Sequence, residues 1–233
     1  MSVKDFEPRP QGAKADSHEF MAWVDRLRNR QNIDDQIEVT FPAPADEMIL
    51  FDVSENAIRK ICICNLISFF TQTASVTIAS SNSETTILGA GEGSLILPAN
   101  NFIVGETIRI LASGYYSTAA APPTMRMRVY LNSTVILDTG ANALANGITD
   151  LHWSIPSADI TCRTIGTTGS VMSQGQVIYS TSHGAATVDD FTPNKTAIQI
   201  NTTIAQTLNV TVQWGTSSSS NSITCTNLNL TNA

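Results

Sequence analysis

The chain has 233 residues, enough for one sizeable β domain with an appendage or for two small domains. Charged residues make up only 14% of it, against about 25% in typical globular proteins. Its net charge of −7 at pH 7 argues against binding to nucleic acid or to an anionic membrane surface. Residues 1–60 carry 8 Lys/Arg and 12 Asp/Glu, whereas residues 61–233 carry 5 and 8. The sequence therefore divides into a charged N-terminal region, residues 1–60, and a nearly neutral body.

The arm, residues 1–35, begins with an extended tail and continues into a short helix of about 14 residues that starts near Asp16. An apolar stripe at helical spacing follows, made by Phe20, Trp23, Val24 and Leu27. So short a helix is marginal in water, and its stripe needs a partner. That partner is either the chain's own body or another subunit or protein. Two prolines in "FPAPADEM" separate the helix from the body and favour the second possibility.

Residues 36–70 contain two apolar runs, "MILFDV" and "IRKICICNLISFF", and predict a connecting β segment. From residue 71 to 233, strands of five to nine residues alternate with Gly-, Asn- and Ser-rich turns. This rhythm is typical of an all-β sandwich or closed barrel. Long connections, such as "ANALANGITDLHW" and "TSHGAATVDDFTPNK", favour a jelly-roll-like antiparallel β-sandwich.

Two strands show the alternation most clearly. Met125, Met127, Val129 and Leu131 alternate with two arginines and a tyrosine, so we expect Arg126 and Arg128 on the opposite, solvated or subunit-facing side. A tight turn at 132–133 should return the chain antiparallel. Near the C-terminus the apolar parity changes, which predicts a bulge at Thr226 and Asn227.

The sequence carries little catalytic chemistry. His18, His152 and His183 are isolated, without metal-ligand spacing or a nucleophile motif. We expect most carboxylates of the body to be simply solvated near turns, and the pair Asp189–Asp190 to be a loop charge or a weak cation contact. Hence we expect no enzyme, no metal and no cofactor.

Three segments could form a ligand-binding end: "GYYSTAAAPP", expected to be a loop, "ITDLHWS" and "TSHGAATVDDF". Their aromatic and imidazole side chains could contact a sugar ring. The candidates are Tyr115, Tyr116, His152, Trp153 and His183. The alternative is that the aromatic rings are buried in the core or at a subunit contact.

The four cysteines are expected to be free buried thiols, because the first residues, "MSVKDFEPRP", lack the apolar core of a secretory signal. Cys62 and Cys64 would share one strand face and could not easily pair. Cys162 and Cys225 complete the set. No CxxC spacing suggests zinc.

Residues 95–233 resemble a C-terminal β domain of tailed-bacteriophage virion proteins. The resemblance rests on "NNFIVGETIRILASGYYSTAAAPPTMRMRVYLNSTVILDTG", "ITCRTIGTTGSVMSQGQ" and "VTVQWGTSSSSNSITCTNLNL". This segment is similar to the jelly-roll modules of head-decoration proteins, head fibres and tail fibres. The arm matches no motif of that family.

This resemblance implies a homotrimer that attaches through its N-terminal segment and binds no cofactor. The expected function is a capsid decoration or cement protein, or a short fibre, whose arm docks on capsid, portal or tail proteins. It would be made in the host cytoplasm and reside in the virion, without nucleic-acid or membrane binding. The alternative is a lectin-like tail-fibre module that recognises a host surface glycan.

Overall fold

The computed structural model describes residues 47–52, 57–62, 69–120, 123–191 and 196–233. Every regular element in these residues is a β-strand, and all pairings between them are antiparallel. The all-β prediction is thus confirmed. The expected helix and its stripe (Phe20, Trp23, Val24, Leu27) lie outside the described residues. Within the described part of the chain there is no helix with the length and hydropathy to span a bilayer.

Strands β1 (Glu47–Asp52) and β2 (Ala57–Cys62) pair only with each other, from Glu47 opposite Cys62 to Asp52 opposite Ala57. They form a two-stranded sheet within the segment expected to carry connecting β structure.

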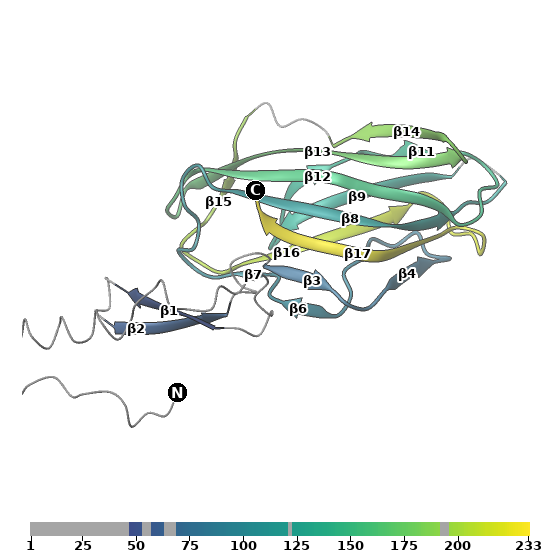
Figure 1. The fold of residues 1–233 in the computed structure, drawn as a ribbon. Coiled ribbons are helices and arrows are strands. Elements are labelled where there is room, and N and C mark those ends of the chain that lie inside the picture. The colour runs from purple at the N-terminus through teal and green to yellow at the C-terminus, as the bar shows by residue number, and fades with distance from the viewer. Residues whose placement is uncertain (1–46, 53–56, 63–68, 121–122, 192–195) are drawn as a thin grey trace, which may run out of the picture. The chain divides into compact units, whose positions relative to one another are not determined.

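The other strands form two sheets (Figure 1). Sheet I has the order β14 (Ala185–Asp190), β13 (Gly169–Ser182), β12 (Leu151–Thr164), β8 (Thr107–Ser117), β17 (Ser222–Asn232), β3 (Phe70–Gln72) and β6 (Gly91–Gly93), with β15 (Ile198–Ile200) paired to β13 and β4 (Val76–Ala79) paired to β17. Sheet II has the order β10 (Thr134–Asp138), β9 (Thr124–Leu131), β16 (Gln206–Trp214) and β5 (Thr85–Thr86), with β11 (Asn142–Ala143) paired to β9 and β7 (Ile96–Leu97) paired to β16.

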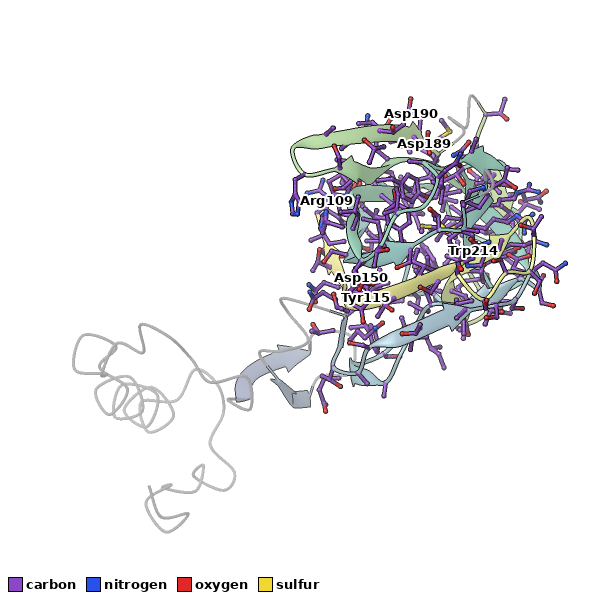
Figure 2. The ribbon with its side chains drawn as sticks, turned by 90° about the vertical axis from the view of Figure 1, so that its right-hand side faces the viewer. Arg109, Tyr115, Asp150, Asp189, Asp190 and Trp214 are labelled. Atoms are coloured by element: carbon purple, nitrogen blue, oxygen red, sulfur yellow. The ribbon has the colours of Figure 1, made fainter. Side chains whose placement is uncertain are left out.

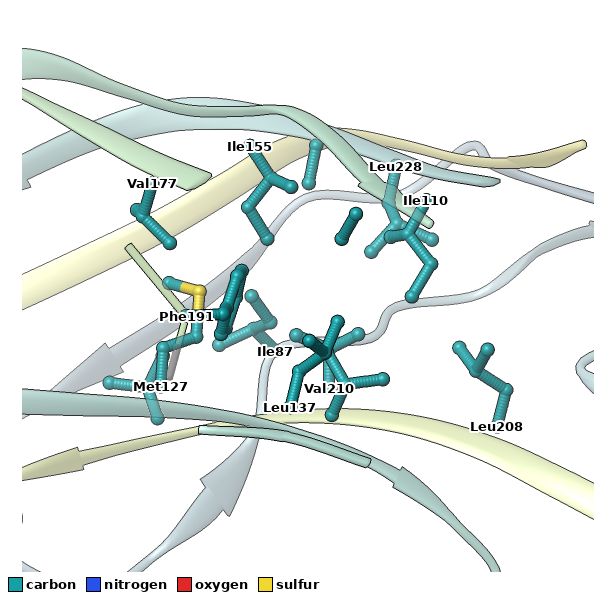
Figure 3. Close-up of a cluster of buried hydrophobic side chains, with 14 of the residues drawn as sticks. Ile87, Ile110, Met127, Leu137, Ile155, Val177, Phe191, Leu208, Val210 and Leu228 are labelled. Atoms are coloured by element: carbon teal, nitrogen blue, oxygen red, sulfur yellow. The ribbon is translucent and has the colours of Figure 1, made fainter. Parts of the chain in front are cut away.

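The two sheets enclose one hydrophobic core (Figure 3). Sheet I contributes side chains such as Ile110 and Leu228, and sheet II contributes Met127 and Val210. Phe191, the residue after β14, is buried between them. Apolar side chains alternate along each long strand because successive residues of a strand point to opposite faces, so only one face of each sheet needs to be apolar.

The predicted alternation, turn and bulge are confirmed. The four inward residues of β9 are fully buried, and β9 turns at Asn132 (φ 51°) into β10. The register of β17 against β8 shifts between Cys225 and Asn227. This bulge keeps Leu228 in the core after the change of parity.

Two expected loops are partly strands, and this corrects the sequence prediction. Strand β8 continues to Ser117 and therefore includes Tyr115 and Tyr116. Likewise β14 occupies much of "TSHGAATVDDF". Both extensions pair with a long neighbouring strand, β12 and β13 respectively, and this pairing outweighs the Gly- and Ala-rich local sequence.

Candidate functional site

Tyr115 and His152 are two solvent-facing members of the predicted ligand-binding set. They lie directly opposite each other on β8 and β12, and both are exposed. The phenol ring of Tyr115 is 42% exposed, and next to it Thr77 and Thr224 join their hydroxyls at 2.8 Å. An exposed aromatic ring beside an imidazole and hydroxyl groups could stack on a sugar and bond its hydroxyls.

Tyr116 and Trp153 belong to the core, and the structure corrects their inclusion in a ligand-binding set. Both are fully buried. The Tyr116 hydroxyl donates to the Ser180 carbonyl at 2.8 Å, and Trp153 Nε1 donates to the Thr224 carbonyl at 2.9 Å. Burial, followed by the charge of Asp189, raises the pKa of Tyr116 to about 12. The alternative interpretation, burial of these rings, is the one that the structure supports.

His183 lies exposed in the turn between β13 and β14. The register places this turn at the same end of the sandwich as Tyr115, since Trp153 lies opposite Tyr179 on β13. Figure 2 looks onto this end and shows Tyr115 and Asp150 well apart from Asp189 and Asp190, which lie on β14. The three predicted segments therefore reach the same end of the sandwich.

Asp189 and Asp190 end strand β14 (Figure 2). Burial raises the pKa of Asp189 above its ordinary value, a hydrogen bond from Asn142 opposes this, and the neighbouring Asp190 adds to it. Among the described residues, no three His, Cys, Asp or Glu side chains gather in a way that could hold a metal ion.

The outer face of sheet II carries a network of polar side chains centred on Glu84. Its carboxylate accepts hydrogen bonds from Tyr130 (2.7 Å) and Thr211, and it forms an ion pair with Arg128. Burial alone would raise the pKa of Glu84, but the bonds from Thr211, Tyr130 and Arg128 hold it below its ordinary value. Arg128 also approaches Asp138 at 3.4 Å.

Two further arginines of the body are paired in the same way. Arg126 donates to the Asp138 carboxylate from both Nε and Nη2. Arg109 donates to the Asp159 carboxylate from Nε at 2.7 Å and from Nη2 at 3.1 Å. The expectation that these carboxylates are simply solvated is therefore wrong for three of them, Glu84, Asp138 and Asp159. Arg109 and Asp159 are 50 residues apart, and Arg128 and Glu84 are 44 residues apart, so the sequence offers no local signal for these pairs. Arg126 and Asp138 are only 12 residues apart, across the predicted hairpin.

Two shallow grooves adjoin on the outer face of sheet I. One, of about 350 Å³, is lined by Arg109, Asp159, Thr161, Arg163 and Gln174 among others. The second, of about 360 Å³, shares Asp159 and Gln174 and extends to Gln176 and Asp190. Neither groove is lined by a histidine or a cysteine. They present hydrogen-bond donors and acceptors without a nucleophile that has an activating base.

Cys162 and Cys225 are free and buried, as expected from the sequence. Burial raises the pKa of Cys225 to about 11, so this thiol is neutral at physiological pH and a poor nucleophile. Burial also raises the pKa of Cys162, and the charge of Glu106 adds to this. Cys62 falls in β2 and Cys64 lies outside the described residues.

One surface was missed in the sequence. Five large aliphatic residues are exposed toward the end of the sandwich opposite Tyr115, and we call them the apolar end: Ile96 on β7, and Ile103, Val104, Ile165 and Ile204 in loops. The sequence could have indicated this surface, because these isoleucines and valines lie among Gly, Asn and Thr residues typical of exposed turns.

Comparison of the chain with models of known protein families, and with curated proteins, found no match.

Proposed function

We propose that this chain is a structural protein of a bacteriophage particle. In this proposal it is a trimeric capsid decoration or cement protein, or a short fibre, that performs no catalysis and uses no cofactor. The arm, residues 1–35, attaches it to capsid, portal or tail proteins through Phe20, Trp23, Val24 and Leu27. It is made in the host cytoplasm and resides in the virion.

The strand order is the observation that carries this proposal. Four strands of sheet I (β4, β8, β12 and β17) and four of sheet II (β5, β9, β10 and β16) form two matching sets, apart from the other strands of each sheet. When each set is numbered by its order along the chain, both sheets read 3-2-4-1. This doubled order, with the chain passing repeatedly between the sheets, is what two Greek keys produce in a jelly roll. This strand order supports the resemblance to the phage modules, which rests on the amino-acid sequence of residues 95–233.

The chemistry of the body also supports a structural role. Its outward arginines on β8 and β9 bind neighbouring carboxylates, and its other exposed positions are largely Ser, Thr and Asn. Because the body has few charges and these arginines are paired with carboxylates, little of its surface charge is left for salt to screen, which suits a particle that meets varied media.

Particles provide the direct test. The gene would be disrupted in the genome that encodes the chain, and the purified full-length chain would be added back to the resulting particles. We expect it to sediment with them at a fixed ratio, and to be detected in wild-type particles by mass spectrometry. A chain that is absent from wild-type particles and does not bind the depleted ones contradicts the proposal.

The exposed Tyr115–His152 pair favours the second candidate function, a lectin-like module that recognises a host surface glycan. Binding of the full-length chain to a glycan array tests it. Tyr115→Ala should abolish the signal, while Val135→Ala, which changes an exposed residue on β10, should leave it unchanged. No binding to any glycan or to host cells would exclude this role.

A further inference from the structure

The outer face of sheet I carries mostly polar side chains. On β8, Arg109, Leu111, Ser113 and Tyr115 point away from the core, because successive residues of a strand face opposite sides and Ile110 is buried. Tyr115 therefore lies on the same face as Arg109, about 20 Å away along the strand. Figure 1 shows β13, β12, β8 and β17 side by side. We call the face between Tyr115 and Arg109, across these four strands, the polar track.

Small side chains form the floor of the polar track at its middle. Ser113 on β8 lies opposite Ser154 on β12, and both are half-buried. Longer amides lie on either side. Asn227 on β17 is opposite Ser113, and Gln176 on β13 is opposite Ser157 on β12, and both amides are exposed. The middle of the track therefore offers a low floor of hydroxyls between two strands that carry amides.

The two shallow grooves of sheet I form the far end of the polar track. They share Asp159 and Gln174, which lie opposite each other on β12 and β13. Arg109 holds Asp159 from the neighbouring strand through hydrogen bonds of 2.7 and 3.1 Å, and the hydroxyls of Thr107 and Thr161 join at 2.8 Å. These polar groups are thus held in place by the protein itself, so binding to them costs little conformational entropy.

The charged side chains that line the two grooves balance each other. They are two arginines, Arg109 and Arg163, and two aspartates, Asp159 and Asp190. A balanced surface lacks the excess of cations that holds a nucleic-acid backbone. Sugar hydroxyls suit it better, because each hydroxyl both donates and accepts hydrogen bonds and can therefore pair with amides, with hydroxyls and with the free positions of an arginine–aspartate pair.

We propose that the polar track binds an extended, neutral polysaccharide. One sugar stacks on the exposed ring of Tyr115, and the following units lie over the serine floor toward Gln174 and Asp159. The distance from Tyr115 to Arg109 exceeds the length of a single sugar, so a chain of several units fits the track. The inference rests on the second candidate function, glycan recognition, and adds the surface beyond Tyr115 and the kind of glycan that it takes.

An array of bacterial surface polysaccharides, together with oligosaccharides of increasing length prepared from them, tests the inference on the full-length chain. We expect a neutral polysaccharide to bind, and the affinity for its oligosaccharides to rise with length until the track is filled. Gln174→Ala and Gln176→Ala should each weaken binding of the longest oligosaccharide by about fivefold, the loss of one hydrogen bond, and leave binding of the shortest one unchanged.

Gln213→Ala is the matched control, because it makes the same change on β16 of sheet II, away from the polar track. It should bind every oligosaccharide as wild type does. Far-UV circular dichroism would show that the variants are folded. Gln174 and Gln176 are exposed and are changed one at a time, so either variant tests the track if the other fails to fold.

The outcomes separate the track from glycan recognition itself. Binding that Tyr115→Ala abolishes, but that neither oligosaccharide length nor the two glutamine changes affect, overturns the track and leaves glycan recognition standing. Equal weakening by Gln213→Ala also overturns the track, and binding of acidic polysaccharides alone overturns the neutral class. If no glycan on the array binds, both glycan recognition and the track are overturned.

Discussion

Gly114 shows how a single residue allows two strands and a buried ring to meet. It lies on β8 between Trp153 on β12 and Cys225 on β17. A Cβ atom there would lie 1.9 Å from the Thr224 carbonyl oxygen and 3.0 Å from Trp153 Nε1, the two atoms that form a hydrogen bond. Glycine is therefore required by close approach rather than by backbone conformation.

Gly114→Ala should consequently lower the free energy of unfolding by about 2–3 kcal/mol, because the strands must separate or the indole must leave its partner. Thermal and urea unfolding would measure this. The neighbouring change Ser113→Ala should stay within about 0.5 kcal/mol of wild type. Equal stability of Gly114→Ala and wild type would show that the Thr224 carbonyl does not lie this close to Gly114.

Glu84 should make stability depend on pH. Its folded pKa is lower than its unfolded pKa, so its contribution is present above the ordinary value of 4.5 and is lost as the pH falls through the folded pKa. Glu84→Gln should cost about 1 kcal/mol at pH 7, since solvent weakens the network, and less at pH 3. Denaturant unfolding at both pH values measures the difference.

The control for this prediction is Glu92→Gln, which changes an exposed carboxylate on β6. At pH 7 it should stay within about 0.5 kcal/mol of wild type, because the change lies on an exposed surface. A Glu84→Gln cost that grows toward pH 3 would contradict the sign of the shift.

At the scale of elements, the bulge in β17 determines which side chains enter the core. Cys225 lies opposite Gly114 and Asn227 opposite Ser113, so Thr226 is the extra residue. Deleting Thr226 would remove the bulge and leave Asn227 opposite Ser113, with Leu228 still facing the core. We expect the deletion to be tolerated and to lower the melting temperature by less than about 10 °C.

Thr226→Ala is the matched variant, because it keeps the extra residue and removes only the hydroxyl bond to the Ser113 carbonyl. It should cost about 1 kcal/mol or less. A deletion that prevents folding would show that Thr226 is not the extra residue of the strand.

The elements that sequence alone could predict are those with an uninterrupted period of two, such as β9 and β16. The change of parity in β17 was also readable, because buried leucines resume on the other parity. The far half of β8 was not, since Gly114 and Ser117 resemble loop residues and their pairing with β12 lies far along the chain. The same distance hides the pairing of Arg109 with Asp159 and the burial of Trp153.

For the whole molecule, we propose that the arm, residues 1–35, attaches the β body to the particle. Removing residues 1–35 should leave a soluble β body with the circular dichroism of sheet structure that no longer binds particles, because the docking stripe is gone. Co-sedimentation with particles measures the loss. Continued incorporation of the shortened chain would refute the tether.

Trp23→Ala separates docking from internal packing. If the stripe binds another virion protein, the variant should attach more weakly while its melting temperature stays that of wild type. A lower melting temperature with unchanged attachment would mean that the stripe packs on the chain's own body.

The role in a virion is tested most directly by electron cryomicroscopy of purified wild-type particles. The account predicts a density on the particle surface that fits the two sheets with their 3-2-4-1 strand order, joined to capsid, portal or tail by a thin N-terminal connection. A complete reconstruction of head and tail in which no density accommodates this sandwich would contradict it.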